Sequence, residues 1–411
     1  MDKKYLLLIV LFSTLYINGA FACTTFIISG KHTANGKPIL FKHRDSQSFN
    51  NSLVFFSDGK YDYIAVVNAE KDNWRTMAWG GYNSEGFAIM NSAAYNNNMG
   101  DTTKFVDQEG VVMKLALQTC RTIEDFEELL KKLPKPLGVD ANFGVIDAFG
   151  GAAYYETGNY TYKKIDANDP LVAPDGFLIR TNHSFGGDMN EGKGYIRYAT
   201  AYSVLNEAAS IGKLEPQYLF NHISRNMTHS LTNTNLYDNL PPNSSIAEYK
   251  TFIDYIPRYF TTSSFVVVGA KEKENPNNTM MWTILGSPLT SVAIPIWMTS
   301  KKQLPKIVGM TNNLHAPICD ASLKLKENCF PIGRGSGKKY INLSVVVNKE
   351  KTGYLQLLEP VENEIFETSN ALLKEMQSEK DREAKILEYY DWLNKYVNQS
   401  YKDLFNIELL E

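Results

Sequence analysis

Long apolar segments are scarce in this sequence. Outside residues 5–17, no stretch approaches the roughly 18 to 20 consecutive apolar residues that a membrane-spanning helix needs. An excess of one charge is also lacking, because 42 Lys and Arg and 45 Asp and Glu are well mixed and give a net charge of -3. The sequence therefore has no basic stripe for nucleic acid and no polybasic cluster for a membrane surface, and we expect neither partner.

Metal-ligating side chains are also few. The six histidines are scattered, and the four cysteines are Cys23, Cys120, Cys319 and Cys329. Their spacing lacks the close pairs and nearby histidines of a zinc site, and no glycine-rich phosphate loop follows a strand, so no metal or cofactor is expected. In an oxidising compartment Cys319 and Cys329 are the natural disulfide candidates. Cys120 lies in an apolar-periodic segment and is expected to be a buried helix residue.

The N-terminus has the pattern of a secretory signal peptide. Two lysines give a positive start, residues 5–17 are almost continuously apolar, and Ala20 and Ala22 are small residues at the cleavage-defining positions. We therefore expect residues 1–22 to be removed and the mature protein to be exported to the periplasm or secreted. Cleavage after Ala22 would make Cys23 the first residue of the mature chain.

The pattern of secondary structure favours an α+β protein. Strands come first, then a helical block, then more strands, and finally Glu/Lys/Leu-rich helices, without the βα alternation that a doubly wound sheet needs. Strands are expected over residues 24–30, 38–45, 63–69, 86–93, 177–183, 261–270, 279–286 and 292–298, and a hairpin over 142–158. Helices are expected over 111–133, 195–212, 216–227 and from 361 onward, with an exposed loop over 228–248.

A cysteine at the first position of a mature chain has a thiol and an α-amine on one carbon. Their unperturbed pKa values are about 8.5 and about 7.7 to 8, so the amine can take the thiol proton directly or through one water. Attack of Cys23 on a carbonyl carbon would give an acyl-enzyme, released by water or by another nucleophile. Two other interpretations stay open for Cys23, which are a disulfide partner and the lipidated cysteine of a lipoprotein. Ala20, where a lipoprotein signal usually has a Leu-like residue, favours ordinary signal peptidase.

Five segments carry a family resemblance in the same order along the chain. They are "CTTFIISGKHTANGKPILFKHRDS", "WGGYNSEGFAIMNSAAYN", "ANFGVIDAFGGAAYYETG", "IRTNHSF" and "MWTILGSPLTSVAIPIW". Together they resemble the N-terminal nucleophile hydrolases of the choloylglycine hydrolase, penicillin V acylase and 6-aminopenicillanic acid acyltransferase group. The resemblance implies a four-layer αββα sandwich of antiparallel sheets. We expect a catalytic domain over 23–350 and a C-terminal helical segment over 351–411 packed on the same domain.

The resemblance also implies roles for residues near Cys23. Cys23 would be the nucleophile, its α-amine the base, and Asp45 the carboxylate that holds the amine. An adjacent basic residue would set the electrostatics of the thiolate. Arg44 is the first candidate, and Lys42 stays open because related families often place an arginine three residues before this aspartate.

Asparagines and a late arginine complete the implied catalytic set. Asn91 and Asn182 resemble the two asparagines near the nucleophile, and an amide of this kind donates to an oxyanion without changing its charge. Asn83 is an alternative to Asn91, and either of them could instead be a turn residue. Arg258 matches the late arginine.

Aromatic and polar residues near these motifs are candidates for substrate binding, because such pockets are mostly apolar with few polar anchors. They are Trp79, Tyr82, Asn83, Tyr95 and His183, whereas Trp282 is expected in the core. We therefore predict an exported cysteine hydrolase of linear amides acting on a small molecule. An acyltransferase, a dipeptidase and a lipid-anchored binding protein remain alternatives, and a homo-oligomer stays open.

Overall fold

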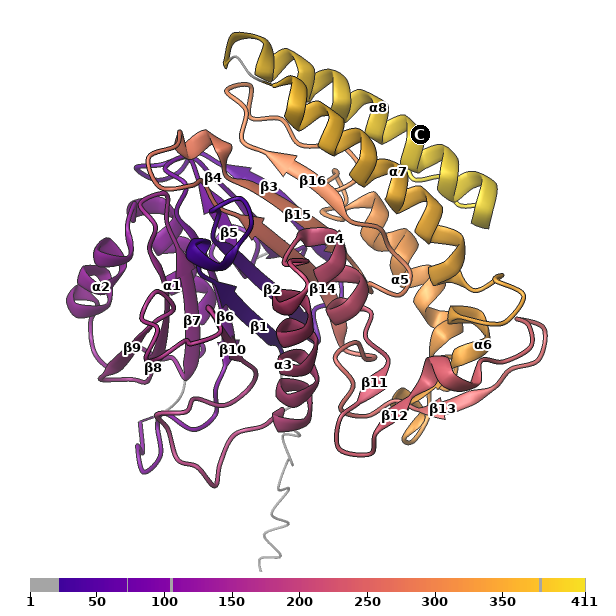
Figure 1. The fold of residues 1–411 in the computed structure, drawn as a ribbon, viewed down its shortest axis with the longest axis horizontal. Coiled ribbons are helices and arrows are strands. Elements are labelled where there is room, and N and C mark those ends of the chain that lie inside the picture. The colour runs from indigo at the N-terminus through magenta and orange to yellow at the C-terminus, as the bar shows by residue number, and fades with distance from the viewer. Residues whose placement is uncertain (1–21, 72, 104–105, 377–378, 411) are drawn as a thin grey trace, which may run out of the picture.

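The computed structural model describes residues 22–71, 73–103, 106–376 and 379–410, so the predicted signal peptide lies outside the described residues except for Ala22. Two antiparallel sheets form its centre (Figure 1). The first sheet has the order β10 (Phe177–Arg180), β1 (Thr24–Ile28), β2 (Ile39–Asp45), β14 (Thr261–Val268), β15 (Met280–Leu285) and β16 (Ile294–Trp297). The second sheet has the order β3 (Asn51–Phe56), β4 (Tyr63–Asn68), β5 (Gly81–Asn83), β6 (Ala88–Ala93), β7 (Ala141–Ile146), β8 (Ala152–Thr157) and β9 (Tyr162–Asp166).

The inner faces of the two sheets meet in one hydrophobic core. Ile27 and Leu40, which pair across β1 and β2, lie in this core with Met90 and Tyr154 of the second sheet. Side chains alternate along a strand, so every second residue of these strands reaches the core between the sheets. The same alternation gives β1 and β2 a second, opposite face.

Helices cover the outer face of each sheet. Helices α1 (Glu109–Thr119) and α2 (Ile123–Lys132) pack on the second sheet, where the ring of Phe126 lies 5.1 Å from that of Tyr155. The first sheet is covered by α3 (Tyr195–Ser210), α4 (Pro216–Leu219), α5 (Pro317–Cys329), α7 (Tyr354–Glu375) and α8 (Glu379–Phe405). The predicted αββα sandwich is confirmed.

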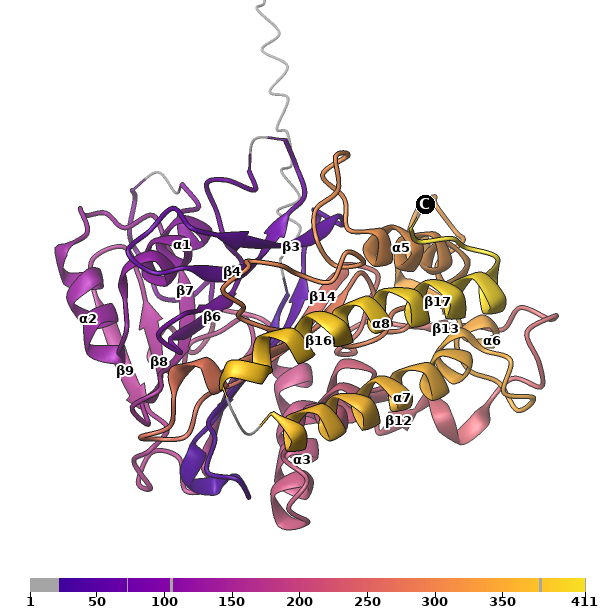
Figure 2. The ribbon, with the colours of Figure 1, turned by 90° about the horizontal axis from the view of Figure 1, so that it is seen from above.

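The C-terminal helices belong to the same core as the first sheet. Both views show α7 and α8 running side by side next to β16 (Figures 1 and 2). Trp282 of β15 stacks on Phe366 of α7 with ring centroids 4.0 Å apart, and Trp297 and Tyr390 of α8 make a second aromatic contact. The expectation that Trp282 is a core residue is confirmed by its 2% exposure.

Two predicted elements differ from the structure. The helix predicted over 111–133 is divided into α1 and α2, because Thr122 starts a new helix with a capping box in which it and Asp125 satisfy each other's backbone N–H groups. Cys120 is buried as predicted but lies just after α1. The predicted loop 228–248 contains the short strands β11 (Thr228–His229) and β12 (Thr234–Asn235) and the turn η3 (Leu236–Asn239). A further small sheet joins β13 (Tyr249–Thr251) to β17 (Tyr340–Asn342), beside α6 (Leu343–Val346).

The predicted disulfide is wrong. Cys319 and Cys329 are both free and buried, and both lie on helix α5. Ten residues of helix separate their Cα atoms by about 15 Å, whereas a disulfide requires less than about 7 Å. Among the helices of the described residues, none has the length and apolar composition that crossing a membrane requires.

Candidate active site

Cys23 directly precedes strand β1 and is buried, as is Ala22 before it. Thr24 pairs with His43 of β2. Continuing this register by one residue sets Cys23 opposite Arg44, beside the end of β2. The first residue of the predicted mature chain therefore lies inside the fold, at the edge of the space between the sheets.

The two faces of the β1–β2 pair look into different surroundings. The hydroxyl of Tyr154 in β8 donates to Thr25 Oγ1 over 2.8 Å, so Thr25 points toward the second sheet. Arg197 of α3 donates to Thr24 Oγ1 over 3.0 Å, so Thr24 points toward the helices. Alternation gives Cys23 the same direction as Thr25. We call these surroundings the intersheet side and the helix side.

Lys42 occupies the intersheet side and is almost completely buried. Its Nζ donates to Asn91 Oδ1 over 2.6 Å and to the carbonyl oxygen of Trp79 over 2.8 Å. Asn91 Nδ2 in turn donates to Glu109. Burial lowers the pKa of Lys42 to about 7, and negative charge on Cys23 is the strongest influence in the opposite direction. Lys42 therefore connects the nucleophile candidate with the predicted asparagine.

Arg44 lies on the same side, but its guanidinium is held by amide side chains. Nη1 donates to Asn51 Oδ1 over 3.0 Å and Nη2 to Asn68 Oδ1 over 2.9 Å. The guanidinium carbon lies 4.7 Å from the ring centroid of Trp79, a cation–π contact. Burial lowers the pKa of Arg44 to about 10, so it is a permanent cation in this position.

Asp45 lies on the helix side, in a cluster of charges. Its Oδ2 is 2.8 Å from Arg258 Nε, and its Oδ1 accepts a hydrogen bond from Thr261 Oγ1 over 2.7 Å. Burial raises the pKa of Asp45 above its ordinary value, whereas Arg258 and Arg197 oppose that shift. Burial and the same two arginines hold the pKa of His43 well below its ordinary value, so this histidine is neutral.

Arg197 of helix α3 joins Cys23 to the second predicted asparagine. Its Nη1 donates to the carbonyl oxygen of Cys23, and its Nη2 donates to Asn182 Oδ1 over 2.7 Å. Asn182 Nδ2 donates to the carbonyl oxygen of Ala93 over 2.8 Å. Burial lowers the pKa of Arg197 to about 9, with Arg258 acting in the same direction.

The arrangement can stabilise negative charge at the Cys23 sulfur. Lys42, Arg44 and Arg197 all interact electrostatically with this residue, and all three are buried, where screening by water is weak. The structure thus brings the predicted residues Cys23, Arg44, Asp45, Asn91, Asn182 and Arg258 into one region, together with the alternative Lys42 and with Glu109 and Arg197.

The predicted substrate-binding residues fall into two groups. Trp79 belongs to the cluster through its contacts with Lys42 and Arg44, and His183 adjoins Asn182 and stacks on Tyr195 with ring centroids 4.1 Å apart. Burial lowers the pKa of His183. The ring of Tyr95 lies 5.1 Å from Lys193 Nζ.

Tyr82 and Asn83 lie elsewhere. The Tyr82 hydroxyl donates to the carbonyl oxygen of Ile296, and the side chain is buried in the core between the sheets. Asn83 donates to the carbonyl oxygens of Leu117 and Cys120 of the helix α1 region. This use of the Asn83 amide excludes it as a substitute for Asn91 in the cluster. Asn83 is the last residue of β5, and its Oδ1 accepts hydrogen bonds from the backbone N–H groups of Glu85 and Phe87 in the turn that follows.

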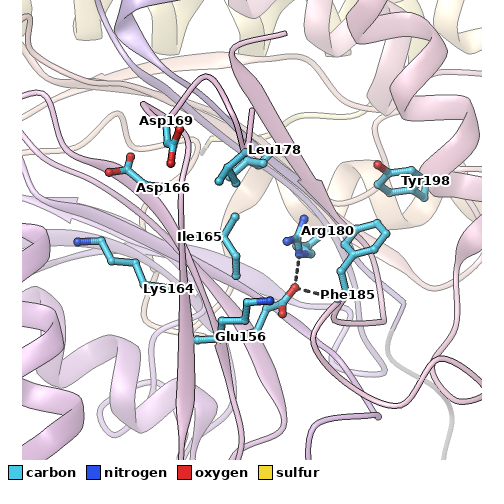
Figure 3. Close-up of a pocket in the computed structure, with 11 residues that line it drawn as sticks. Glu156, Lys164, Ile165, Asp166, Asp169, Leu178, Arg180, Phe185 and Tyr198 are labelled. Atoms are coloured by element: carbon cyan, nitrogen blue, oxygen red, sulfur yellow. Dashed lines mark hydrogen bonds and ion pairs between the residues drawn. The ribbon is translucent and has the colours of Figure 1, made fainter. Parts of the chain in front are cut away.

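A cavity of about 620 Å³ opens one strand away from β1. Its wall includes the buried ion pair of Arg180 and Glu156, with Nε and Oε1 2.9 Å apart, and the rings of Phe185 and Tyr198 (Figure 3). Arg180 pairs with Thr25 of β1. None of the predicted catalytic residues lines this cavity, although the rings of Phe185 and Tyr198 also contact His183.

The described ranges contain no group of three or more His, Cys, Asp or Glu side chains that could hold a metal ion.

Residues 45–281 match the family model of acyl-coenzyme A:6-aminopenicillanic acid acyl-transferase. The match covers more than half of the chain, so the protein belongs to this family. The predicted membership of the N-terminal nucleophile superfamily is thereby confirmed. Cys23 precedes the matched segment, so its role depends on the geometry described above. No curated protein matches the sequence.

Several solved structures resemble the chain distantly. Penicillin V acylase from Agrobacterium tumefaciens is 16% identical, covering 68% of this chain and 87% of its own, with a TM-score of 0.40. A variant of conjugated bile acid hydrolase from Clostridium perfringens is 12% identical, covering 69% and 94%, with a TM-score of 0.40. The Caenorhabditis elegans ortholog of N-acylethanolamine-hydrolyzing acid amidase is 15% identical, covering 63% and 99%, with a TM-score of 0.40. Similarity at this level assigns neither residue roles nor a substrate.

Sequence reasoning missed Glu109 and Arg197. Both are charged residues inside helices that the sequence predicts or nearly predicts, and such residues usually face solvent. Their contacts come from strands that are distant in the chain, so the local pattern has no signal for them.

Proposed function

We propose that the protein is an exported enzyme that cleaves a linear amide through an acyl group on Cys23. The observation that carries this proposal is the buried position of Cys23 at the start of β1. There it shares an environment with three cationic side chains and lies near Asn91 and Asn182. Removal of the segment ending at Ala22 would leave the Cys23 α-amine beside its own thiol.

In the proposed reaction the α-amine takes the proton of the Cys23 thiol, and the sulfur attacks the carbonyl carbon of the amide. The carbonyl oxygen becomes an oxyanion that the amide N–H groups of Asn91 and Asn182 stabilise. The carbon–nitrogen bond then breaks, and the departing amine takes the proton from the Cys23 ammonium. Water attacks the remaining thioester, which releases a carboxylic acid and restores the thiol.

Two charged residues near Cys23 would have separate tasks, one toward its α-amine and the other toward its thiolate. Asp45 would hold the α-amine, which belongs to the backbone of the residue directly before β1. Lys42 rather than Arg44 supplies the cation for the thiolate, because Lys42 contacts Asn91, the proposed oxyanion donor, whereas Arg44 contacts Asn51 and Asn68, which have no part in the proposed reaction. The sequence analysis named Arg44 as the first candidate for this role and Lys42 as the alternative.

The test combines mass spectrometry with a substrate screen. The intact mass of the exported protein gives its first residue. The purified protein and the Cys23→Ala variant are then offered bile-acid conjugates, penicillin V, N-acyl amino acids and short peptides. We expect a mature chain that starts at Cys23, an acyl adduct on Cys23, and no turnover by Cys23→Ala. Cys120→Ala, which removes another buried thiol, serves as the matched control and should keep its activity. Activity in Cys23→Ala would refute the proposal.

Acyl transfer is a second candidate, favoured because the matched family is that of an acyl-transferase. Transfer would differ from hydrolysis only in the last step, where an amine rather than water attacks the thioester. Adding an acceptor amine to the assay and analysing the products separates the two reactions. A new amide would indicate transfer, whereas the free acid alone would indicate hydrolysis. A product pattern restricted to cleaved dipeptides would indicate a dipeptidase.

The same intact mass distinguishes a lipid-anchored binding protein. A lipid on Cys23 would occupy the sulfur that the proposed reaction needs. A mass increased by acyl chains, together with an inactive protein, would therefore replace the enzyme proposal.

A further inference from the structure

Glu109 is a buried acid that the reaction proposed above does not use. It is the first residue of helix α1, it is 4% exposed, and it accepts a hydrogen bond from Asn91 Nδ2. Its backbone N–H donates to Asp107 Oδ1 over 3.1 Å. Burial of an acid has a large cost unless the group is hydrogen-bonded, so its position calls for a reason.

The orientation of the Asn91 amide follows from its two neighbours. The ammonium of Lys42 can only donate, so the atom that it contacts over 2.6 Å must be the amide oxygen. The amide nitrogen therefore faces Glu109, which accepts one of its two N–H groups. The other N–H of Asn91 has no acceptor among the residues that the structure describes.

We propose that Glu109 is a positioning residue of this enzyme, which holds the Asn91 carboxamide so that its second N–H is available to the oxyanion formed at Cys23. This inference depends on the proposed function. Lys42 and Glu109 fix the amide from opposite ends, so it needs no reorientation when the oxyanion forms. Preorganised donors of this kind contribute to the transition state rather than to substrate binding.

The charge state of Glu109 suits this task. Burial raises the pKa of Glu109 well above its ordinary value, Asp107 and Asp140 act in the same direction, and Lys42 and the Asn91 hydrogen bond oppose them. A neutral carboxyl accepts the amide hydrogen without placing a negative charge beside the oxyanion. A glutamine, which has the same length and a carbonyl oxygen, should therefore replace Glu109, whereas a methionine should not.

The experiment compares Glu109→Gln and Glu109→Met with the wild type on a substrate that depends on Cys23. We expect kcat to fall about 10- to 100-fold in Glu109→Met with KM within about threefold, and to stay within about threefold in Glu109→Gln. Glu128→Gln, an exposed acid on α2, is the control for the substitution itself. Thermal unfolding followed by circular dichroism shows whether each variant is folded.

A folded Glu109→Met with the kcat of the wild type would overturn the inference, as would a folded Glu109→Gln with a kcat reduced about 100-fold. If Glu109→Met does not fold, the kcat of Glu109→Gln can still overturn the inference, because a folded glutamine variant is expected to keep its activity. Failure of the proposed function is recognised separately, because it would appear as turnover in Cys23→Ala.

Discussion

The two sides of the β1–β2 strand pair handle charge in different ways. On the intersheet side a single chain of contacts runs from Lys42 through Asn91 to Glu109, and the acid at its end has a raised pKa. On the helix side the carboxylate of Asp45 is surrounded by Arg258 and Arg197. The intersheet side thus combines the fixed cation Arg44 with a lysine and an acid whose charged forms burial disfavours, whereas the helix side pairs one carboxylate with arginines.

This difference assigns separate tasks to the two sides. A group that stabilises the charge of a reaction intermediate must be held in position without having its own charge or N–H group fully used by other partners. On the intersheet side, Lys42 and Asn91 are such groups. A group that must hold the nucleophile in place benefits from strong, permanent pairs, and the helix side provides those. The following predictions test whether the division is real.

The largest effect is expected for Asp45→Asn on the helix side. We expect kcat/KM to fall about 10³-fold, because the α-amine loses its carboxylate. The free energy of unfolding should fall by about 3 kcal/mol, because Arg258 and Arg197 lose their buried partner. Steady-state kinetics and denaturant unfolding measure the two quantities. Asp62→Asn, at the partly exposed pair with Lys302, should change neither by much. Unaltered turnover in Asp45→Asn would remove the helix side from the reaction.

The next effect concerns Lys42 on the intersheet side. Lys42→Met should lower kcat/KM about 10²-fold, whereas Lys42→Arg should keep most of the activity because it retains a cation. The pKa of Lys42 is lowered to about 7 by burial, so the wild type loses its ammonium as the pH rises through that value. The arginine stays charged. The activity of Lys42→Arg relative to the wild type should therefore increase above about pH 7 in a pH–rate profile. A constant ratio would contradict this assignment.

Arg197 should have a smaller effect, because it acts on the position of Cys23 and Asn182. Arg197→Lys should lower kcat about tenfold, since an ammonium cannot bridge the Cys23 carbonyl and the Asn182 amide as a planar guanidinium does. Arg121→Lys, at an exposed pair with Glu85, is the control. Equal kinetics for both variants would show that catalysis does not depend on the two hydrogen bonds of the Arg197 guanidinium.

The smallest effect on activity is expected for Lys326→Met on helix α5. Burial lowers the pKa of Lys326 to about 7 in the folded protein, below the value of about 10.4 in the unfolded chain. Between these values the unfolded chain binds more protons, so the free energy of unfolding should rise with pH. Lys326→Met should make that rise smaller, because one of the buried lysines with a lowered pKa is removed, and should leave kcat within about threefold. Denaturant unfolding at several pH values measures the slope, and an unaltered slope would contradict the expectation.

The sequence predicts the strands well, because they depend on local patterns. Alternating apolar residues indicate β1, β2 and β14 directly. The position of Cys23 after Ala22 is visible without any structure. Asp45, Asn91 and Asn182 follow from the resemblance, since each lies in a short motif. The sequence does not predict the break between α1 and α2, because the capping residue Thr122 lies within a continuous apolar period.

The rest of the site depends on contacts that no local pattern contains. Arg197 reaches Cys23 across 174 residues of chain, and it is recognisable only when α3 lies on the first sheet. The choice between Arg44 and Lys42 depends on which amides surround each of them. Likewise, the spacing of Cys319 and Cys329 suggests a disulfide until both are seen on one helix.

Strand β2 pairs on one side with its neighbour β1 and on the other with β14, and the Thr261–Asp45 hydrogen bond spans 216 residues of chain. Closing so long a loop is entropically costly and slow. A chain that ends before Thr261 still contains Asp45, Arg197 and Arg258, but it lacks strand β14 and the Thr261 hydroxyl that donates to Asp45. In such a fragment Cys23 is present, but strand β2 has lost its second neighbour and Asp45 has lost a hydrogen bond. We therefore expect the surroundings of Cys23 to be complete only when β14 has paired with β2.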